Sequence, residues 1–171
     1  MPNTKVTREE IEQSAELIGT HRIILRKKDF RDEDFSDIVL DGANLNRSNF
    51  EEVNLSNASL KNAKLERIDF ERANLKDALL IKASLFRSNM EDANLEGADL
   101  TEAYMGKTVL KGANLQDANL SKVRFHFADL RDADLSTAVI NDTDFRWAKY
   151  NEDTVWPDGF NPRLAGARLT V

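Results

Sequence analysis

The side chains that could carry out proton-transfer or metal chemistry in this 171-residue chain are 30 acidic residues and two histidines, since cysteine is absent. Paired carboxylates can act as a general acid and a general base, and histidine can ligate a metal ion. However, His21 and His126 lie far apart in the sequence and lack the spacing of a metal-binding motif. The seven glycines are scattered, so the chain has no glycine-rich phosphate-binding loop.

Most of the acidic residues belong to a repeat of five residues. Every multiple of five from Phe30 to Tyr150 is apolar or aromatic, which makes 25 consecutive positions. A small residue, most often alanine, stands two positions earlier, and Asn or Asp often stands directly before the apolar residue. The acids therefore occupy routine outward positions of the repeat, where we expect them to be solvated. We predict no catalytic residue, no metal site, no cofactor and no enzymatic activity.

Neither a helix nor a strand places a five-residue repeat on one side. Residues five apart are displaced by about 140° around an α-helix, and an odd spacing alternates between the two faces of a strand. The chain must therefore turn a corner in each unit, so that four units close a square coil of 20 residues. Asn or Asp suits such a corner, because its short side chain bonds to nearby backbone and tolerates unusual dihedral angles.

The repeated units, such as ANLQDANL at residues 113–120, resemble the A(D/N)LXX consensus of the pentapeptide-repeat family over about 120 residues. The resemblance implies an all-β fold, a right-handed quadrilateral β-helix of about six coils spaced 4.7–4.9 Å apart. We divide the chain into an N-terminal capping helix at residues 1–21, the pentapeptide-repeat β-helix at 22–150 and a C-terminal capping segment at 151–171.

A helix is predicted at residues 7–18, where it can cover the unpaired backbone at the first end of the solenoid. Thr7 and Glu10 have the spacing of a capping box, and Gly19 can end the helix. The apolar face expected to lie over the first coil comprises Ile11, Ala15 and Ile18.

The run TVWPDGFNPRLAGA that follows Tyr150 resembles closing segments of cyanobacterial pentapeptide-repeat proteins. We expect Trp156 and Phe160 to plug the last coil. Asn161 and Pro162 should open a short helix that Gly166 ends.

In a 20-residue coil, residues 20 apart stack in columns. One inward column begins Phe30, Phe50, Phe70, and another ends with Phe125 and Phe145. Such rings could line a cofactor tunnel, but we expect them to fill the core, since protein interiors contain few voids larger than water.

One outward face gathers nine basic and two acidic residues, although the whole chain has a net charge of −6. A column of this face is the candidate partner-binding strip: Lys27, Arg47, Arg67, Arg87, Lys107, Phe127 and Trp147. Exposed aromatics and arginines are favoured anchors of protein interfaces. The alternative is a solvated face whose bases pair with acids of the neighbouring face, with Trp147 serving in the C-terminal cap.

Two functions are consistent with these surfaces. The first is a non-catalytic rigid scaffold or adaptor that binds another protein, of unknown identity, through one face. The second follows from the resemblance, because some family members mimic DNA and bind type II topoisomerases, which protects against quinolones or modulates gyrase. Mimicry needs a long negative surface. The basic strip and the mixed charges of the next face therefore favour the scaffold.

The composition also bears on the cellular location and the partners of the protein. The start of the chain is unlike a signal peptide, and no run of 18 apolar residues occurs, so we expect a cytoplasmic protein without a membrane partner. The acidic excess disfavours direct nucleic-acid binding. We expect a monomer or a weak dimer.

Overall fold

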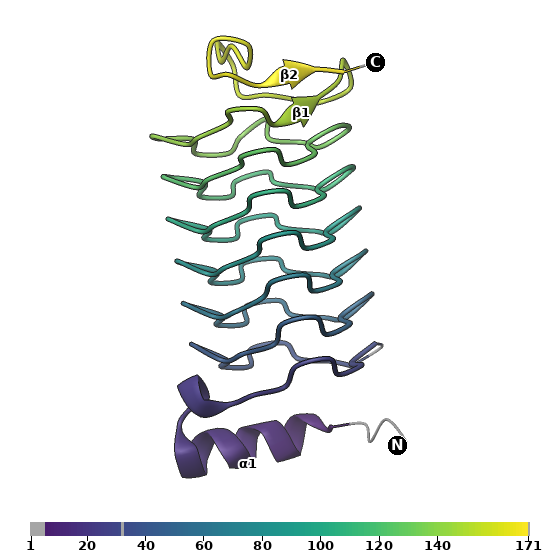
Figure 1. Cartoon of the computed structure of the whole chain (residues 1–171), viewed down its shortest axis with the longest axis vertical. Helices are drawn as coiled ribbons and strands as arrows, with labels where there is room; N and C mark the ends of the chain where they lie inside the picture. Colours follow the sequence, from purple (N-terminus) through teal and green to yellow (C-terminus); the bar gives the residue numbers. More distant parts are fainter. Residues whose placement is uncertain (1–5, 32, 171) are drawn as a thin grey trace.

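The chain winds into a stack of four-sided coils, with a helix at its N-terminal end (Figure 1). The computed structural model describes residues 6–31 and 33–170. The elements are α1 (Arg8–Ile18), the 3₁₀ helix η1 (Thr20–Arg22), β1 (Lys149–Tyr150) and β2 (Arg168–Leu169). The predicted capping segments 1–21 and 151–171 extend into residues 1–5 and 171, which lie outside the described residues.

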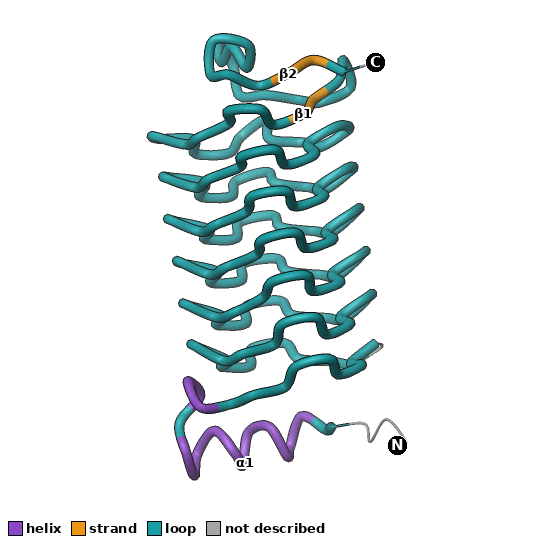
Figure 2. Tube along the Cα trace, viewed as in Figure 1, coloured by secondary structure: helices purple, strands orange, loops and turns teal. Residues whose placement is uncertain are grey.

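Successive coils are joined by parallel bridges between residues 20 apart. The ladder that starts at Ile24 continues through residues 44, 64, 84, 104, 124 and 144, and further ladders start at Asp29, Asp34 and Val39. Each side of a coil is too short for a continuous strand, so the tube in Figure 2 is drawn almost wholly as loop. This register confirms the predicted 20-residue coil, on which every assignment of a residue to a face depends.

The corners are hydrogen-bonded turns. The amide of Ser48 donates to the carbonyl of Leu45 at 3.2 Å, and the third residue of this turn, Arg47, has φ 65°. A positive φ at that place is the mark of a type II turn. Among residues 6–31 and 33–170, twenty non-glycine residues have such a φ, although the left-handed region costs them about 1–2 kcal/mol each. The three glycines at equivalent corners avoid this cost: Gly42, Gly97 and Gly112.

We expected Asn or Asp to bond to nearby backbone and to adopt the unusual dihedral angle at the corner, and only the first part is correct. The side chain does bond the backbone, as when Asn49 Oδ1 accepts the amide of Glu51 at 2.9 Å. The unusual dihedral angle, however, falls on the second residue after the apolar one, such as Glu52. The reason is that the chain changes direction at the outward tip of the corner, whereas Asn49 lies in the bridged side of the coil.

Apolar and small side chains fill the axis of the solenoid. Leu45 and Ala43 are both fully buried. In nearly every unit the apolar residue and the residue two positions before it are buried in the same way. Phe30 and Phe50 have ring centroids 4.7 Å apart, and Phe50 and Phe70 lie 5.4 Å apart. The stacked rings pack directly on one another, which agrees with a filled core.

The N-terminal helix α1 lies across the first coil (Figure 1). Thr7 and Glu10 form the predicted capping box, and Ile11 is buried against the core. Arg8 Nη1 donates to the carbonyl of Ser36 at 2.8 Å, which satisfies part of the open coil edge. The prediction for Ile18 is wrong, because this residue is 47% exposed.

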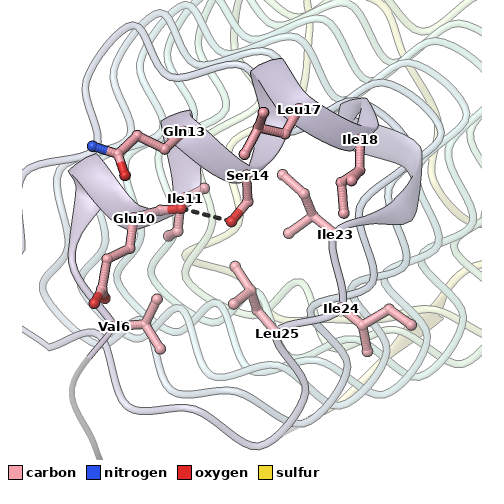
Figure 3. Close-up of a pocket in the computed structure, with 10 residues that line it drawn as sticks. All are labelled: Val6, Glu10, Ile11, Gln13, Ser14, Leu17, Ile18, Ile23, Ile24 and Leu25. Carbon is pink, nitrogen blue, oxygen red and sulfur yellow. Dashed lines mark hydrogen bonds between the residues drawn. The ribbon is translucent and has the colours of Figure 1, made fainter.

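Ile18 lies in the last turn of α1, directly before Gly19 redirects the chain at φ 79°. That turn does not close onto the coil, and a groove of about 610 Å³ remains between them. Figure 3 shows Leu17, Ile18, Ile23 and Ile24 around this groove. The helix thus covers only part of the first coil.

The C-terminal segment adds an irregular last coil. Val155 pairs with Asp134, one residue beyond the 20-residue register, and β2 pairs in parallel with β1. Trp156 packs edge-on against Phe145 with centroids 5.2 Å apart, and against Phe160 at the same distance. These rings lie over the last full coil, as expected of a plug.

The predicted short helix after Asn161 is wrong, since residues 162–166 form only turns. Asn161 Oδ1 accepts the amide of Arg163 at 3.1 Å, but Gly166 then adopts φ 86°. The carbonyl of Gly166 accepts the amide of Trp147 at 2.9 Å, so pairing with the coil draws the tail back after a single turn. Among the described residues, no helix is long and apolar enough to cross a membrane.

Candidate functional site

The candidate strip forms one unbroken column on the side of the solenoid that we call the basic face, which contains the columns beginning at Ile24, Arg26 and Lys27. Arg47 donates its amide to the carbonyl of Glu66, and Arg67 donates to that of Phe86, each at 3.0 Å. The structure brings all seven predicted residues together: Lys27, Arg47, Arg67, Arg87, Lys107, Phe127 and Trp147. Each has φ between 56° and 65°, so each lies at the tip of a corner.

The five bases of this strip form no ion pair within the part of the chain that the structure describes. The two acids of the same face are engaged elsewhere. Glu66 accepts from Ser84 Oγ at 3.3 Å, and Asp144 binds Arg146 at 2.7 Å. Within the described residues, the five bases therefore do not form the pairs with acids of the neighbouring face that the alternative interpretation expected.

Two exposed rings end the strip. Phe127 and Trp147 are 55% and 45% exposed, and they stack with centroids 6.3 Å apart at an angle of 9°. Lys107 Nζ lies 5.9 Å from the centroid of Phe127, and Arg168 Cζ lies 3.8 Å from that of Trp147. Cations over aromatic rings are mutually attractive. Trp147 is thus held by the C-terminal segment and still presents almost half its surface to solvent.

A second aromatic pair lies beside the strip. Phe86 and Tyr104 stack with centroids 5.4 Å apart at 6°, and Arg87 and Arg124 lie over their rings. Gly106 permits this arrangement, because a Cβ there would come within 3.0 Å of the Tyr104 ring. Sequence reasoning missed Tyr104 and Gly106, and the signal was a glycine in a column otherwise made of larger residues.

The two aromatic pairs border a shallow hollow of about 490 Å³. Its lining combines rings with cationic or ionisable side chains: Phe86, Tyr104, Lys107, His126, Phe127, Arg146 and Trp147. A smaller hollow of about 170 Å³ lies beside Arg47 and Arg67. The face therefore offers positive charge along its length and an apolar recess near its C-terminal end.

The titratable groups of this face suit binding better than proton transfer. A hydrogen bond from Arg146 holds the pKa of Asp144 below its usual range, and the nearby His126 acts in the same direction. A carboxyl with a lowered pKa is a poor general acid near neutral pH. Across the described ranges 6–31 and 33–170, no three His, Asp or Glu residues lie close enough together to hold a metal ion.

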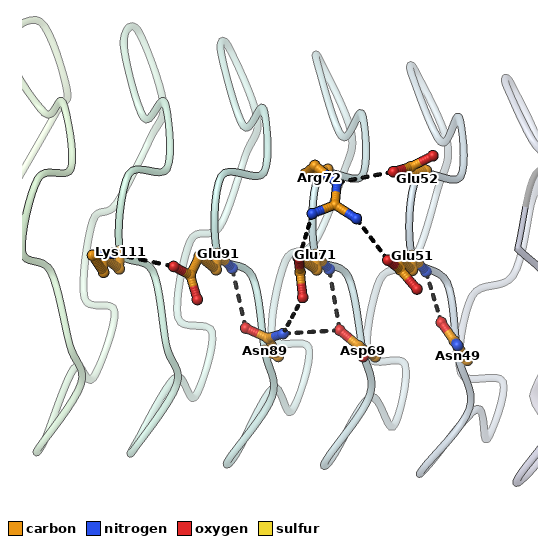
Figure 4. Close-up of polar contacts among 9 residues, drawn as sticks. All are labelled: Asn49, Glu51, Glu52, Asp69, Glu71, Arg72, Asn89, Glu91 and Lys111. Atoms are coloured by element: carbon orange, nitrogen blue, oxygen red, sulfur yellow. Dashed lines mark hydrogen bonds and ion pairs between the residues drawn. The ribbon is translucent and has the colours of Figure 1, made fainter.

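The neighbouring face, which we call the mixed face, contains the columns that begin at Asp29 and Arg31, and ion pairs between its own residues neutralise part of its negative charge. Figure 4 shows Arg72 between Glu51, Glu52 and Glu71, with its contacts to Glu51 and Glu52 at 2.7 and 2.9 Å. Hydrogen bonding to Glu52 raises the pKa of Arg72. In the same figure Lys111 pairs with Glu91 at 3.3 Å. This face is therefore not a continuous negative surface.

Comparison with known families agrees with the geometry. Eight copies of the pentapeptide repeat match the chain, in segments at residues 34–72, 54–92, 88–126, 98–136 and 118–149. These segments span more than half of the 171 residues, and the chain belongs to the pentapeptide-repeat family. Members of the family form right-handed β-helical solenoids and are generally non-enzymatic scaffolds.

Similar solved structures include three pentapeptide-repeat proteins of different origin. Full-length QnrB1, a plasmid-mediated fluoroquinolone resistance protein, is 17% identical, with 97% of this chain and 89% of that chain covered and a TM-score of 0.43. A protein of the Arabidopsis thaliana thylakoid lumen is 22% identical, with 72% and 68% covered and a TM-score of 0.41. HetL, involved in heterocyst differentiation regulation in the cyanobacterium Nostoc sp. strain PCC 7120, is 22% identical, with 95% and 92% covered and a TM-score of 0.27. None of the curated proteins matches the chain.

Proposed function

We propose that the protein is a non-catalytic, rigid scaffold that binds an acidic protein partner through the basic face. The observation that carries the proposal is the row of five stacked bases, none of them ion-paired within residues 6–31 and 33–170. A base already paired must lose its partner before it binds a new one. The unpaired row gains attraction from any carboxylate that approaches, and its summed field steers an acidic partner toward it.

Rigidity supports the same function. Each coil is tied to the next by backbone hydrogen bonds on all four sides, as between Leu45 and Lys64 at 2.9 Å. The row is thus held in place before binding, and preorganisation reduces the entropy that association must lose. The exposed pair of Phe127 and Trp147 adds the type of aromatic anchor that dominates binding energy at interfaces.

The alternative, a DNA mimic that binds a type II topoisomerase, has weaker support. A mimic needs uncompensated negative charge in a long row, whereas Arg72 and Lys111 neutralise carboxylates on the mixed face. A gyrase supercoiling assay with stoichiometric protein tests it directly. Inhibition or protection of gyrase by the purified protein would support the DNA-mimic function.

The test of the scaffold is a charge reversal on the row. We expect the triple variant Arg47→Glu, Arg67→Glu and Arg87→Glu to lose the proteins that the unmodified chain captures from a lysate of its native organism. The matched control is Lys61→Glu, Lys82→Glu and Lys122→Glu, which changes the net charge equally on a different face. Capture by the triple variant at the level of the unmodified chain, with both variants folded, would exclude the basic face as the docking site.

A further inference from the structure

The spacing of the row indicates the conformation of the segment that it binds. Resting on the function proposed above, we propose that this segment is an acidic α-helix that lies along the solenoid axis, with one carboxylate per turn and an apolar anchor beyond the last carboxylate. The inference depends on distances along the axis, on the unpaired charge of the row and on the position of the aromatic recess.

The row repeats once per coil, because its members are 20 residues apart and each donates its amide to a carbonyl of the next coil, as Arg47 does to Glu66. At the spacing of paired strands, about 4.8 Å, the four steps from Lys27 to Lys107 span about 19 Å. Five carboxylates on one side of a helix, at positions i, i+4, i+7, i+11 and i+14, span about 21 Å. Five on one side of an extended strand span about 27 Å.

The five carboxylates of a helix therefore stay in register with the five bases. The five carboxylates of a strand span more than one coil spacing beyond the row of bases. The mismatch of about 2 Å for a helix is within the reach of flexible Lys and Arg side chains, and the mismatch of about 8 Å for a strand is not. The corner position of each base supports this reading, since Arg47, Arg67 and Arg87 project from the tips of successive turns. Like the residues of a helix face, they form one ridge parallel to the long axis.

The aromatic recess lies at the correct end for an anchor. Phe127 is one coil beyond Lys107, so its position along the row is about 24 Å from Lys27. Residue i+18 of the helix lies about 27 Å from residue i, beside the hollow that Phe86, Tyr104, Phe127 and Trp147 border. Because Phe127 and Trp147 are exposed, Phe86 and Tyr104 are half-buried and their neighbours are cationic, an apolar or aromatic side chain flanked by carboxylates fits there.

Three synthetic peptides of identical composition test the proposal. The first has Glu at i, i+4, i+7, i+11 and i+14 and Trp at i+18. The second keeps this Trp but places Glu at every second residue, and the third distributes Glu around all sides of a helix. Binding is measured by fluorescence anisotropy, and helix content by circular dichroism with and without the full-length protein.

We expect the first peptide to bind at least about 10-fold more tightly than the other two and to gain helix on binding. The variant Arg47→Glu, Arg67→Glu and Arg87→Glu should abolish this preference, and Lys61→Glu, Lys82→Glu and Lys122→Glu should preserve it. The double variant Phe127→Ala and Trp147→Ala should weaken the first peptide, but should not weaken a version in which Ser replaces its Trp.

Each other outcome overturns the inference in a distinct way. Equal or tighter binding of the second peptide, still lost in the Arg47, Arg67 and Arg87 variant, would remove the helix while retaining the basic face as a docking site. If none of the three peptides binds, the proposal of a helical ligand is also excluded. The capture of proteins from the lysate then decides separately whether the basic face binds a folded surface. If those three substitutions affect neither the peptides nor the captured proteins, the proposed function fails as well.

Discussion

The basic face and the mixed face have the same backbone but opposite charge arrangements. Both are flat sides of one solenoid with the same 20-residue register. On the mixed face, Arg72 stacks above Glu52 and lies beside Glu71, so cations and carboxylates meet within and between coils. On the basic face the same sign recurs at each of five coils, and Glu66 beside it is engaged by Ser84. Stacking thus partly neutralises the mixed face and leaves the five bases of the strip without ion pairs in the described residues.

The difference shows how a repeat fold separates stability from surface chemistry. A row of like charges about 4.8 Å apart is unfavourable, although water and salt screen most of the repulsion. The solenoid tolerates the row because its core and backbone ladders hold every coil. We expect the following changes, from the largest effect to the smallest, to test this separation.

The largest effect should come from Leu75→Asp, which attacks the core that both faces share. Leu75 is fully buried, so the substitution removes about 1.5–3 kcal/mol of apolar burial and places a carboxylate in the core. Because domains are stable by only about 5–15 kcal/mol, we expect no cooperative thermal unfolding transition. Leu75→Met is the matched control and should unfold cooperatively. A folded Leu75→Asp variant with both faces intact would contradict the shared core.

The second largest loss of stability should come from Trp156→Ala. This substitution removes the aromatic plug at the C-terminal end of the solenoid, where the exposed rings of the basic face also lie. Trp156 contacts Phe145, Tyr150 and Phe160, and we expect a loss of roughly 3 kcal/mol in urea denaturation. Trp156→Phe should cost less, because the indole Nε1 is buried without a hydrogen-bond partner in the described structure. Equal losses for the two variants would show that the apolar contacts of the ring do not explain the cap.

A smaller effect should distinguish the two faces directly. Arg72 and Arg67 have φ 55° and 56°, so replacement of either by Ala meets the same corner strain. Arg72→Ala leaves three carboxylates together and should lower the thermal midpoint by about 2–4 °C. Arg67→Ala removes one repulsive neighbour and should leave the midpoint unchanged or slightly raised. The difference should shrink in 0.5 M NaCl, and equal midpoints at low salt would contradict a stabilising pairing of Arg72 with the three carboxylates.

The smallest effect should be a pH dependence from Asp144, the acid that binds Arg146 on the basic face. Its folded pKa lies below the unfolded value of about 3.9, so its contribution is present above pH 4 and is lost as the pH falls through the folded pKa. Thermal midpoints of Asp144→Asn and the unmodified chain should therefore converge as the pH falls below 4. Arg146→Gln should remove most of the same difference. If the two thermal midpoints still differ at pH 2.5, the charge of Asp144 is not the cause of the difference.

The sequence was informative about this protein wherever a property repeats. The 20-residue register, the buried columns of Phe30 and Phe125, the alignment of Arg47 with Arg67 and the Thr7 cap all follow from spacing, because a solenoid converts sequence period directly into position. No comparable rule covered the ends. Ile18 is exposed and the tail after Asn161 forms only a turn, since single non-repeating contacts decide both.

By itself, then, the sequence determined which residues lie inside, which face outward and which stack, since all three follow from periodicity. Only the tertiary structure decided which charges meet. An ion pair depends on side-chain reach across a corner or between coils, and these distances unite Arg72 with three carboxylates while leaving Arg47 and Arg67 without an acidic partner in the described residues. The physical reason is that period fixes the column of a residue, whereas pairing depends on angstrom-scale distances between the ends of flexible side chains.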